Sequence, residues 1–179
     1  QLFQRTEVFM YSNSNNFLIQ LKPVSIAQLC RGSSIPEARR VEGAVLVSTP
    51  SDLDLNCTIT FRTKTAHQYF IIRFVELKLG CDDHLKLFDQ DSYYGQQSIH
   101  DYSCRDNMAS VRDLRTTGTF LTIRYTTDSN NQPGDGFRIV ITAVFDYPNC
   151  PSDYFSCRDH YCISRSLVCD GIHHCLDRS

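Results

Sequence analysis

Residues 119–145 read TFLTIRYTTDSNNQPGDGFRIVITAVF, two apolar runs separated by a polar segment. One face of the second run is apolar: Phe137, Ile139, Ile141, Ala143 and Phe145. The other face carries Arg138 and Thr142. Alternation with a period of two indicates a β-strand with one buried and one wetter face. The segment between the runs, residues 128–136, is dense in turn-forming residues and predicts a long hairpin connection.

Further runs of this kind lie on the N-terminal side of this hairpin. They occupy residues 58–63, 69–79 and 85–88. Short strands separated by turn residues are typical of an all-β fold, and we expect an antiparallel β-sandwich. Helix signals are limited to about one turn each at residues 51–55 and 107–114. Residues 1–29 are expected to form an extended arm on this domain.

The overall composition excludes several classes of protein. The chain has 179 residues and a formal net charge of -2, so it lacks the electrostatic footprint of a nucleic-acid-binding or anionic-membrane-binding protein. No apolar run reaches the length that a membrane span requires. There is also no signal peptide, and we expect that one has been removed.

Nine cysteines indicate an oxidised, extracellular chain. Zinc binding through His173 and His174 beside Cys175 is the alternative, although no CxxC pair occurs. The sequon at Asn56 predicts N-glycosylation and agrees with secretion.

The composition changes at residues 147–151. The 30 residues that follow the sandwich, 150–179, hold five of the cysteines and few aliphatic side chains. So short a segment cannot bury enough apolar surface to fold unaided, and disulfides or a bound ion must stabilise it. We therefore expect a small, disulfide-rich second module.

Residues 30–147 resemble a CUB domain. The resemblance rests on four cysteines in the family's order, on the apolar alternation of residues 70–79, and on the Gly136-Phe137 pair that opens the last strand. Family connectivity implies two disulfides: Cys30–Cys57 and Cys81–Cys104. By the chain-entropy estimate each bridge stabilises the fold by roughly 3 to 4 kcal/mol.

Residues 150–179 resemble the LDL receptor class A repeat. The cysteine spacing matches, as do Phe155 and the Cys169-Asp170-Gly171 triplet. The resemblance implies two further disulfides: Cys150–Cys162 and Cys157–Cys175. It leaves Cys169 without a partner, and we expect the family's sixth cysteine to follow Ser179 in a longer protein.

Class A repeats fold around calcium, which prefers oxygen ligands. The resemblance implies carbonyl ligands from Leu167 and Ile172 and a carboxylate from Asp170. His174 replaces the next carboxylate, which weakens the site, and the resemblance implies that the last two acidic ligands lie beyond Ser179. Leu167 also replaces the aromatic residue that, beside the acidic cluster, captures a ligand lysine. A purely structural spacer is therefore the alternative to a lysine-binding repeat.

Many CUB domains also bind calcium, and here Asp83 and Asp128 match two of the family's ligands. The family's third ligand is a Glu. Counting back from Cys81 places Glu76 at this position, whereas matching the apolar alternation of residues 70–79 places Gly80 there and leaves the cage incomplete. We favour the second alignment, because shifting a strand by one residue would turn every side chain to the wrong face. Four acidic residues lie close together in this part of the sequence: Asp82, Asp83, Asp89 and Asp91. They predict either a cation-binding edge or a solvated loop.

Motifs for catalysis are missing, so the sequence predicts no enzyme. Aromatic residues in the loop between the third and fourth cysteines predict a surface for a protein partner, with the alternative that they cover the sheet. These residues are Tyr93, Tyr94 and Tyr102.

The combination of modules implies the protein-binding region of a single-pass receptor or coreceptor on the extracellular face of the plasma membrane, in cell–cell signalling such as neuronal development or cell migration. Its partner would be an extracellular protein, and its membrane contact a span further downstream. A noncatalytic region of a secreted or membrane-anchored protease is the alternative, and a matrix or complement-like adaptor is a third.

Overall fold

The computed structural model of the chain describes residues 22–31, 38–95, 97–130, 132, 135–146, 148 and 150–179. Its strands form two sheets, and the expected fold class, a β-sandwich followed by a small disulfide-rich module, is confirmed. The first sheet has the order β2-β4-β9-β6-β7. Its strands are β2 (Arg39–Arg40), β4 (Asn56–Arg62), β6 (His84–Phe88), β7 (His100–Tyr102) and β9 (Phe120–Thr126).

The second sheet is organised around one long strand, β10 (Gly136–Asp146). Strand β5 pairs with one edge of β10, and β3 and β12 pair with successive parts of the other edge. Val144 shows the two edges, since its partners are Tyr69 of β5 and Ile163 of β12. The remaining strands extend these pairs outward. The bounds of the strands are β1 (Val24–Ser25), β3 (Gly43–Val47), β5 (Tyr69–Lys78), β8 (Leu114–Arg115), β11 (Tyr154–Ser156) and β12 (Tyr161–Ser164).

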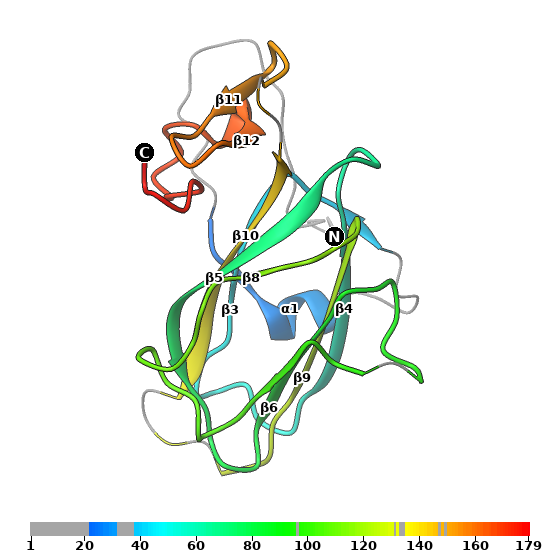
Figure 1. Cartoon of the computed structure of the whole chain (residues 1–179). Coiled ribbons are helices and arrows are strands. Elements are labelled where there is room, and N and C mark those ends of the chain that lie inside the picture. Colours follow the sequence, from blue (N-terminus) through cyan, green and yellow to red (C-terminus); the bar gives the residue numbers. More distant parts are fainter. Residues whose placement is uncertain are drawn as a thin grey trace, which may run out of the picture.

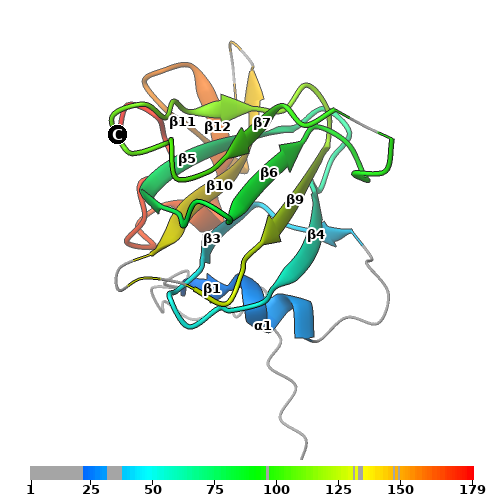
Figure 2. The same ribbon diagram turned by 90° about the horizontal axis from the view of Figure 1, so that it is seen from below.

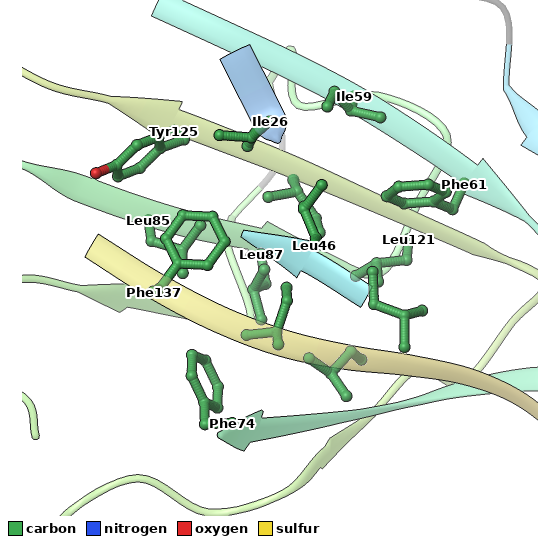
Figure 3. Packing of buried hydrophobic residues seen from close by; sticks show 14 of the residues in the cluster. Ile26, Leu46, Ile59, Phe61, Phe74, Leu85, Leu87, Leu121, Tyr125 and Phe137 are labelled. Carbon is green, nitrogen blue, oxygen red and sulfur yellow. The ribbon is translucent and has the colours of Figure 1, made fainter. Parts of the chain in front are cut away.

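The core lies between the two sheets. Figure 3 shows side chains from both sheets pointing toward one another, with Tyr125 of β9 beside Phe137 of β10. These two rings meet edge to face with their centroids 5.0 Å apart. Full burial of one such side chain is worth about 1.5–3 kcal/mol relative to leaving it exposed.

A short helix closes one side of the sandwich (Figure 2). Helix α1 (Ile26–Arg31) buries Ile26 and Leu29, and the Cys30–Cys57 disulfide links it to β4. The extended arm expected for residues 1–29 is wrong for residues 24–29, which form β1 and most of α1, and residues 1–21 lie outside the described part of the chain. The helical turns expected at 51–55 and 107–114 are hydrogen-bonded turns.

The C-terminal module continues the second sheet. Strand β12 pairs with β10 at residues 144–146, where the pairing with β3 has ended, and β11 pairs with β12. Figure 1 shows this hairpin and the C terminus at the far end of β10. A 3-10 turn, η1 (Arg165–Leu167), follows β12. The two modules are therefore joined by sheet hydrogen bonds as well as by the chain.

Candidate functional site

The face of β10 that alternation predicts to be wet is covered by the C-terminal module. Thr142 is only 2% exposed, and the expectation that it faces solvent is wrong. An apolar cluster on this face combines side chains from both modules: Ile71, Val144, Cys157, Ile163, Leu167 and Cys175. Alternation within β10 does not reveal this burial, because the covering layer comes from a separate segment of the chain.

A buried polar chain crosses the boundary between the modules. The Nδ1 atom of His174 lies 2.8 Å from the Thr142 hydroxyl, and its Nε2 atom lies 3.0 Å from Oδ2 of Asp170. The other carboxylate oxygen of Asp170 accepts a hydrogen bond from the backbone N–H of Ile172 at 2.9 Å. Asp170 and His174 are 3% and 4% exposed, so protein groups rather than water satisfy their polar atoms.

One position of the calcium site that the resemblance implies does not fit that ion, because His174 offers nitrogen where calcium prefers oxygen. Each oxygen of Asp170 accepts an N–H hydrogen bond from its own module. The side chain of Leu167 packs toward Gly43, where a Cβ added to the glycine would lie 2.9 Å from Leu167 Cδ2. Leu167 therefore contributes apolar contact to the boundary.

The second acidic region lies at the opposite end of β10. The buried carboxylate of Asp83 accepts hydrogen bonds from the backbone N–H groups of Gly80 and Asp128, both at 3.2 Å. Asp128 in turn accepts N–H bonds from Asn130. Burial raises the pKa of Asp83, which disfavours its charged form. These carboxylates organise the loops by hydrogen bonding.

The two alternative positions for the third ligand of that site lie in different surroundings. Gly80 lies beside Asp83, as the apolar register requires, whereas Glu76 is exposed and faces Arg138 at 3.6 Å. Asp89 accepts hydrogen bonds from Thr117 and so does not turn toward Asp83. Across the ranges that the structure describes, no three His, Cys, Asp or Glu side chains gather closely enough to hold a metal ion.

Tyr93 and Tyr94 form an aromatic surface beside the first sheet. Their rings stack with centroids 4.2 Å apart, and Tyr94 is 75% exposed. Phe88 of β6 contacts Tyr93, and the guanidinium of Arg124 lies 4.6 Å from the centre of the same ring. An exposed aromatic pair backed by an arginine is the kind of surface that protein partners recognise.

Tyr102 does not belong to this surface. It is 1% exposed, its ring packs against Phe74 at 4.7 Å, and burial raises its pKa to about 12. The expectation that Tyr102 binds a partner is therefore wrong for this structure. It lies on β7, whose pairing with β6 turns the ring into the core.

The predicted glycosylation position, Asn56, lies next to the aromatic surface. Its side chain is exposed, and its Oδ1 accepts a hydrogen bond from Arg124 at 3.3 Å. Arg124 therefore connects Asn56 with Tyr93. Nothing in the sequence predicts this proximity, because Arg124 and Asn56 meet only when β4 pairs with β9.

The structure contains the four cysteine pairs that the resemblances imply. They are Cys30–Cys57, Cys81–Cys104, Cys150–Cys162 and Cys157–Cys175. Cys169 is exposed and has no disulfide partner among the residues that the structure describes. Zinc binding by His173 and His174 with Cys175 is wrong, since Cys175 is bonded to Cys157 and His174 faces Thr142 and Asp170.

Comparison with known families identifies the second module. Residues 148–179 match the model of the "Low-density lipoprotein receptor domain class A" family, so this segment is a class A repeat, as its cysteine spacing predicts. Class A repeats are noncatalytic modules of disulfide-rich extracellular proteins, and the comparisons indicate no catalytic family. No curated protein matches the chain.

Several solved structures also match part of the chain. The full extracellular region of zebrafish Gpr126/Adgrg6 is 16% identical over 62% of this chain and 15% of that chain, with a TM-score of 0.46. The CUB1-EGF-CUB2 domain of human MASP-1/3 is 17% identical over 68% of this chain and 56% of that chain, with a TM-score of 0.48. The present chain thus spans less than two thirds of either structure.

Within the described residues, none of the helices has the length and apolar character needed to cross a bilayer.

Proposed function

We propose that the chain is an extracellular protein-binding region of a single-pass receptor or coreceptor, and that Tyr93, Tyr94 and Arg124 form its contact surface. The observation that carries this proposal is the exposed, stacked tyrosine pair with Tyr94 at 75% exposure. Tyrosine and arginine dominate the energetics of protein interfaces because they combine large apolar area with hydrogen-bonding groups.

The geometry of the surface favours binding without a large ordering cost. Tyr93 is held between Phe88 and Tyr94 and under the Arg124 guanidinium, so its ring is fixed before a partner arrives. A preorganised aromatic anchor loses little conformational entropy on association. The partner would be an extracellular protein, and a glycan at Asn56 would lie beside its footprint.

The class A repeat acts in this proposal as a support for the sandwich. Its Asp170 is 3% exposed and already hydrogen-bonded, so it is not available to capture a ligand lysine. Leu167, at the aromatic position of lysine-binding repeats, is 4% exposed and faces Gly43. These two contacts favour the spacer interpretation over lysine binding.

The test is a double variant, Tyr93→Ser with Tyr94→Ser, in the complete ectodomain. We expect binding to partners found in an unbiased screen of extracellular proteins to weaken at least tenfold, since two anchor residues are lost. The free energy of unfolding should fall by about 1–2 kcal/mol at most, the worth of the stacked ring pair and of the contact between Tyr93 and Arg124.

Val75→Ser supplies the matched control, because Val75 is a 43% exposed apolar residue on the other sheet. Unchanged binding by the tyrosine variant, or a large loss of stability, would contradict the proposed surface. The downstream coding sequence tests the receptor assignment separately. An apolar run of about twenty residues supports it, and a protease signature refutes it in favour of the noncatalytic region of a protease.

A further inference from the structure

The buried polar side chains of the turn at residues 170–175 are hydrogen-bonded within the protein. In the class A family this turn carries calcium ligands, yet here every polar side chain on it that is buried has a protein partner. His174 contacts both Asp170 and Thr142, and the backbone N–H of Ile172 donates to Asp170. Because these groups are almost fully buried, leaving any one of them unpaired would be strongly unfavourable.

Both ring nitrogens of His174 are engaged in hydrogen bonds. Nε2 bonds to Oδ2 of Asp170, where the carboxylate accepts. Nδ1 and the hydroxyl of Thr142 form the second bond at 2.8 Å, whose donor is set by the tautomer of the ring. Asp170 thus accepts two N–H hydrogen bonds from its own module, and the imidazole of His174 also bonds to Thr142 of β10.

A cationic side chain of the sandwich completes the arrangement. Arg73 of β5 donates from Nη2 to the carbonyl oxygen of His173 and from Nη1 to that of Cys175, the latter at 3.4 Å. Arg73 lies opposite Val140 in the sheet, on the strand next to the one that carries Thr142. A guanidinium therefore binds backbone carbonyls of this turn, and its positive charge comes from the neighbouring module.

We propose that the sandwich replaces calcium in organising the class A repeat: Thr142, acting through His174, and Arg73 hold the 170–175 turn, and the two modules form one calcium-independent folding unit. This inference does not depend on the proposed receptor function, because it concerns only the boundary between the modules. It rests on the disagreement between the family's calcium ligands and the hydrogen-bonded groups found here.

The first experiment needs no substitution and uses the longer protein, with the residues that follow Ser179 included. Thermal unfolding and amide hydrogen exchange are measured with excess EDTA and with millimolar calcium, and calcium is titrated by calorimetry. We expect the same unfolding midpoint in both solutions, unchanged protection of the amides at residues 170–175, and no heat of binding. A higher midpoint or greater protection in calcium would overturn the proposal.

The second experiment tests the histidine. His174→Ala is compared with His173→Ala, whose side chain is exposed. We expect the first variant to lower the unfolding midpoint by several degrees and to increase exchange at residues 170–175 at least tenfold, while the second leaves both unchanged. Equal behaviour of the two variants would refute the role of His174.

Thr142→Val is the milder variant if His174→Ala fails to fold. It removes only the hydroxyl that shares a hydrogen bond with Nδ1 of His174 and leaves Asp170 paired. We expect faster exchange confined to the repeat, with the strands of the sandwich still protected. Unchanged exchange throughout the repeat would refute the connection through Thr142.

Discussion

The sandwich and the class A repeat are stabilised in different ways. Among the described residues, the sandwich core holds 22 buried apolar residues from both sheets and α1. The cluster under the repeat holds six, and two of these, Ile71 and Val144, belong to the sandwich. A module of this size needs help from disulfides or a neighbour, and here the repeat has two disulfides and the outer face of β10. The repeat is an extension of the second sheet, because its strand β12 pairs with β10.

Damage to the sandwich core should have the largest effect on both regions. Phe70→Ala removes a side chain with 0% exposure and should destabilise the chain by about 3–5 kcal/mol. Because Ile71 and Val144 complete the apolar cluster of the repeat, its amides should lose protection together with those of the sandwich. Denaturant unfolding followed by hydrogen exchange measures both regions, and a repeat with its own unchanged transition would show that it folds independently.

Damage at the boundary should affect the repeat alone. In Gly43→Ala the new Cβ would lie 2.9 Å from Cδ2 of Leu167 and 3.1 Å from Cε1 of His174, so these side chains must move. We expect a loss of about 1–3 kcal/mol, with faster exchange in the repeat and unchanged exchange in β4 and β9. Gly118→Ala is the control, since the added methyl group would meet nothing within 4 Å. Similar effects of the two variants would mean that the boundary is loosely packed.

The smallest effect is expected at the opposite end of β10. Asp135 accepts a backbone N–H from Gln132 at 2.7 Å and pairs with Lys78 at 3.0 Å. Burial alone would raise the pKa of Asp135, but these partners outweigh it and the pKa is lowered. A folded-state pKa below the unfolded one means that stability is present above about pH 4 and is lost as the pH falls through the folded pKa.

Asp135→Asn should therefore lower the free energy of unfolding by up to about 1 kcal/mol at pH 7 and by less at pH 3. Urea unfolding of both proteins at the two pH values measures this difference. The repeat should keep its hydrogen-exchange protection in the variant. A deficit that grows at pH 3 would contradict the assigned direction of the pKa shift.

Much of the sandwich could be predicted from the sequence. Strands expected at 69–79 and 85–88 are found at Tyr69–Lys78 and His84–Phe88, because alternation reports directly which face of a strand is buried. Helix α1 was not predicted, since six residues are too few to show a helical period. The class A repeat could be predicted as a unit because its cysteine spacing is specific.

The boundary between the modules could not be predicted. Alternation placed Thr142 on a wet face, and no pattern in one strand reveals that a later segment covers it. His174 stood out as a departure from the family, but its partner on β10 lies 32 residues away. Tyr102 was misplaced for a similar reason, because its direction depends on pairing with β6 rather than on its own neighbours.

The shared strand β10 also has a mechanical consequence. Tension applied beyond Cys175 reaches the repeat through the Cys157–Cys175 bridge, and from there it enters the sandwich through the hydrogen bonds between β12 and β10 as well as through the polypeptide connection. Two connections in parallel make the junction between the modules stiff, whereas a single linker would let the modules rotate relative to each other. Any pull on this part of the chain would thus turn the sandwich and its exposed Tyr94 together with the repeat.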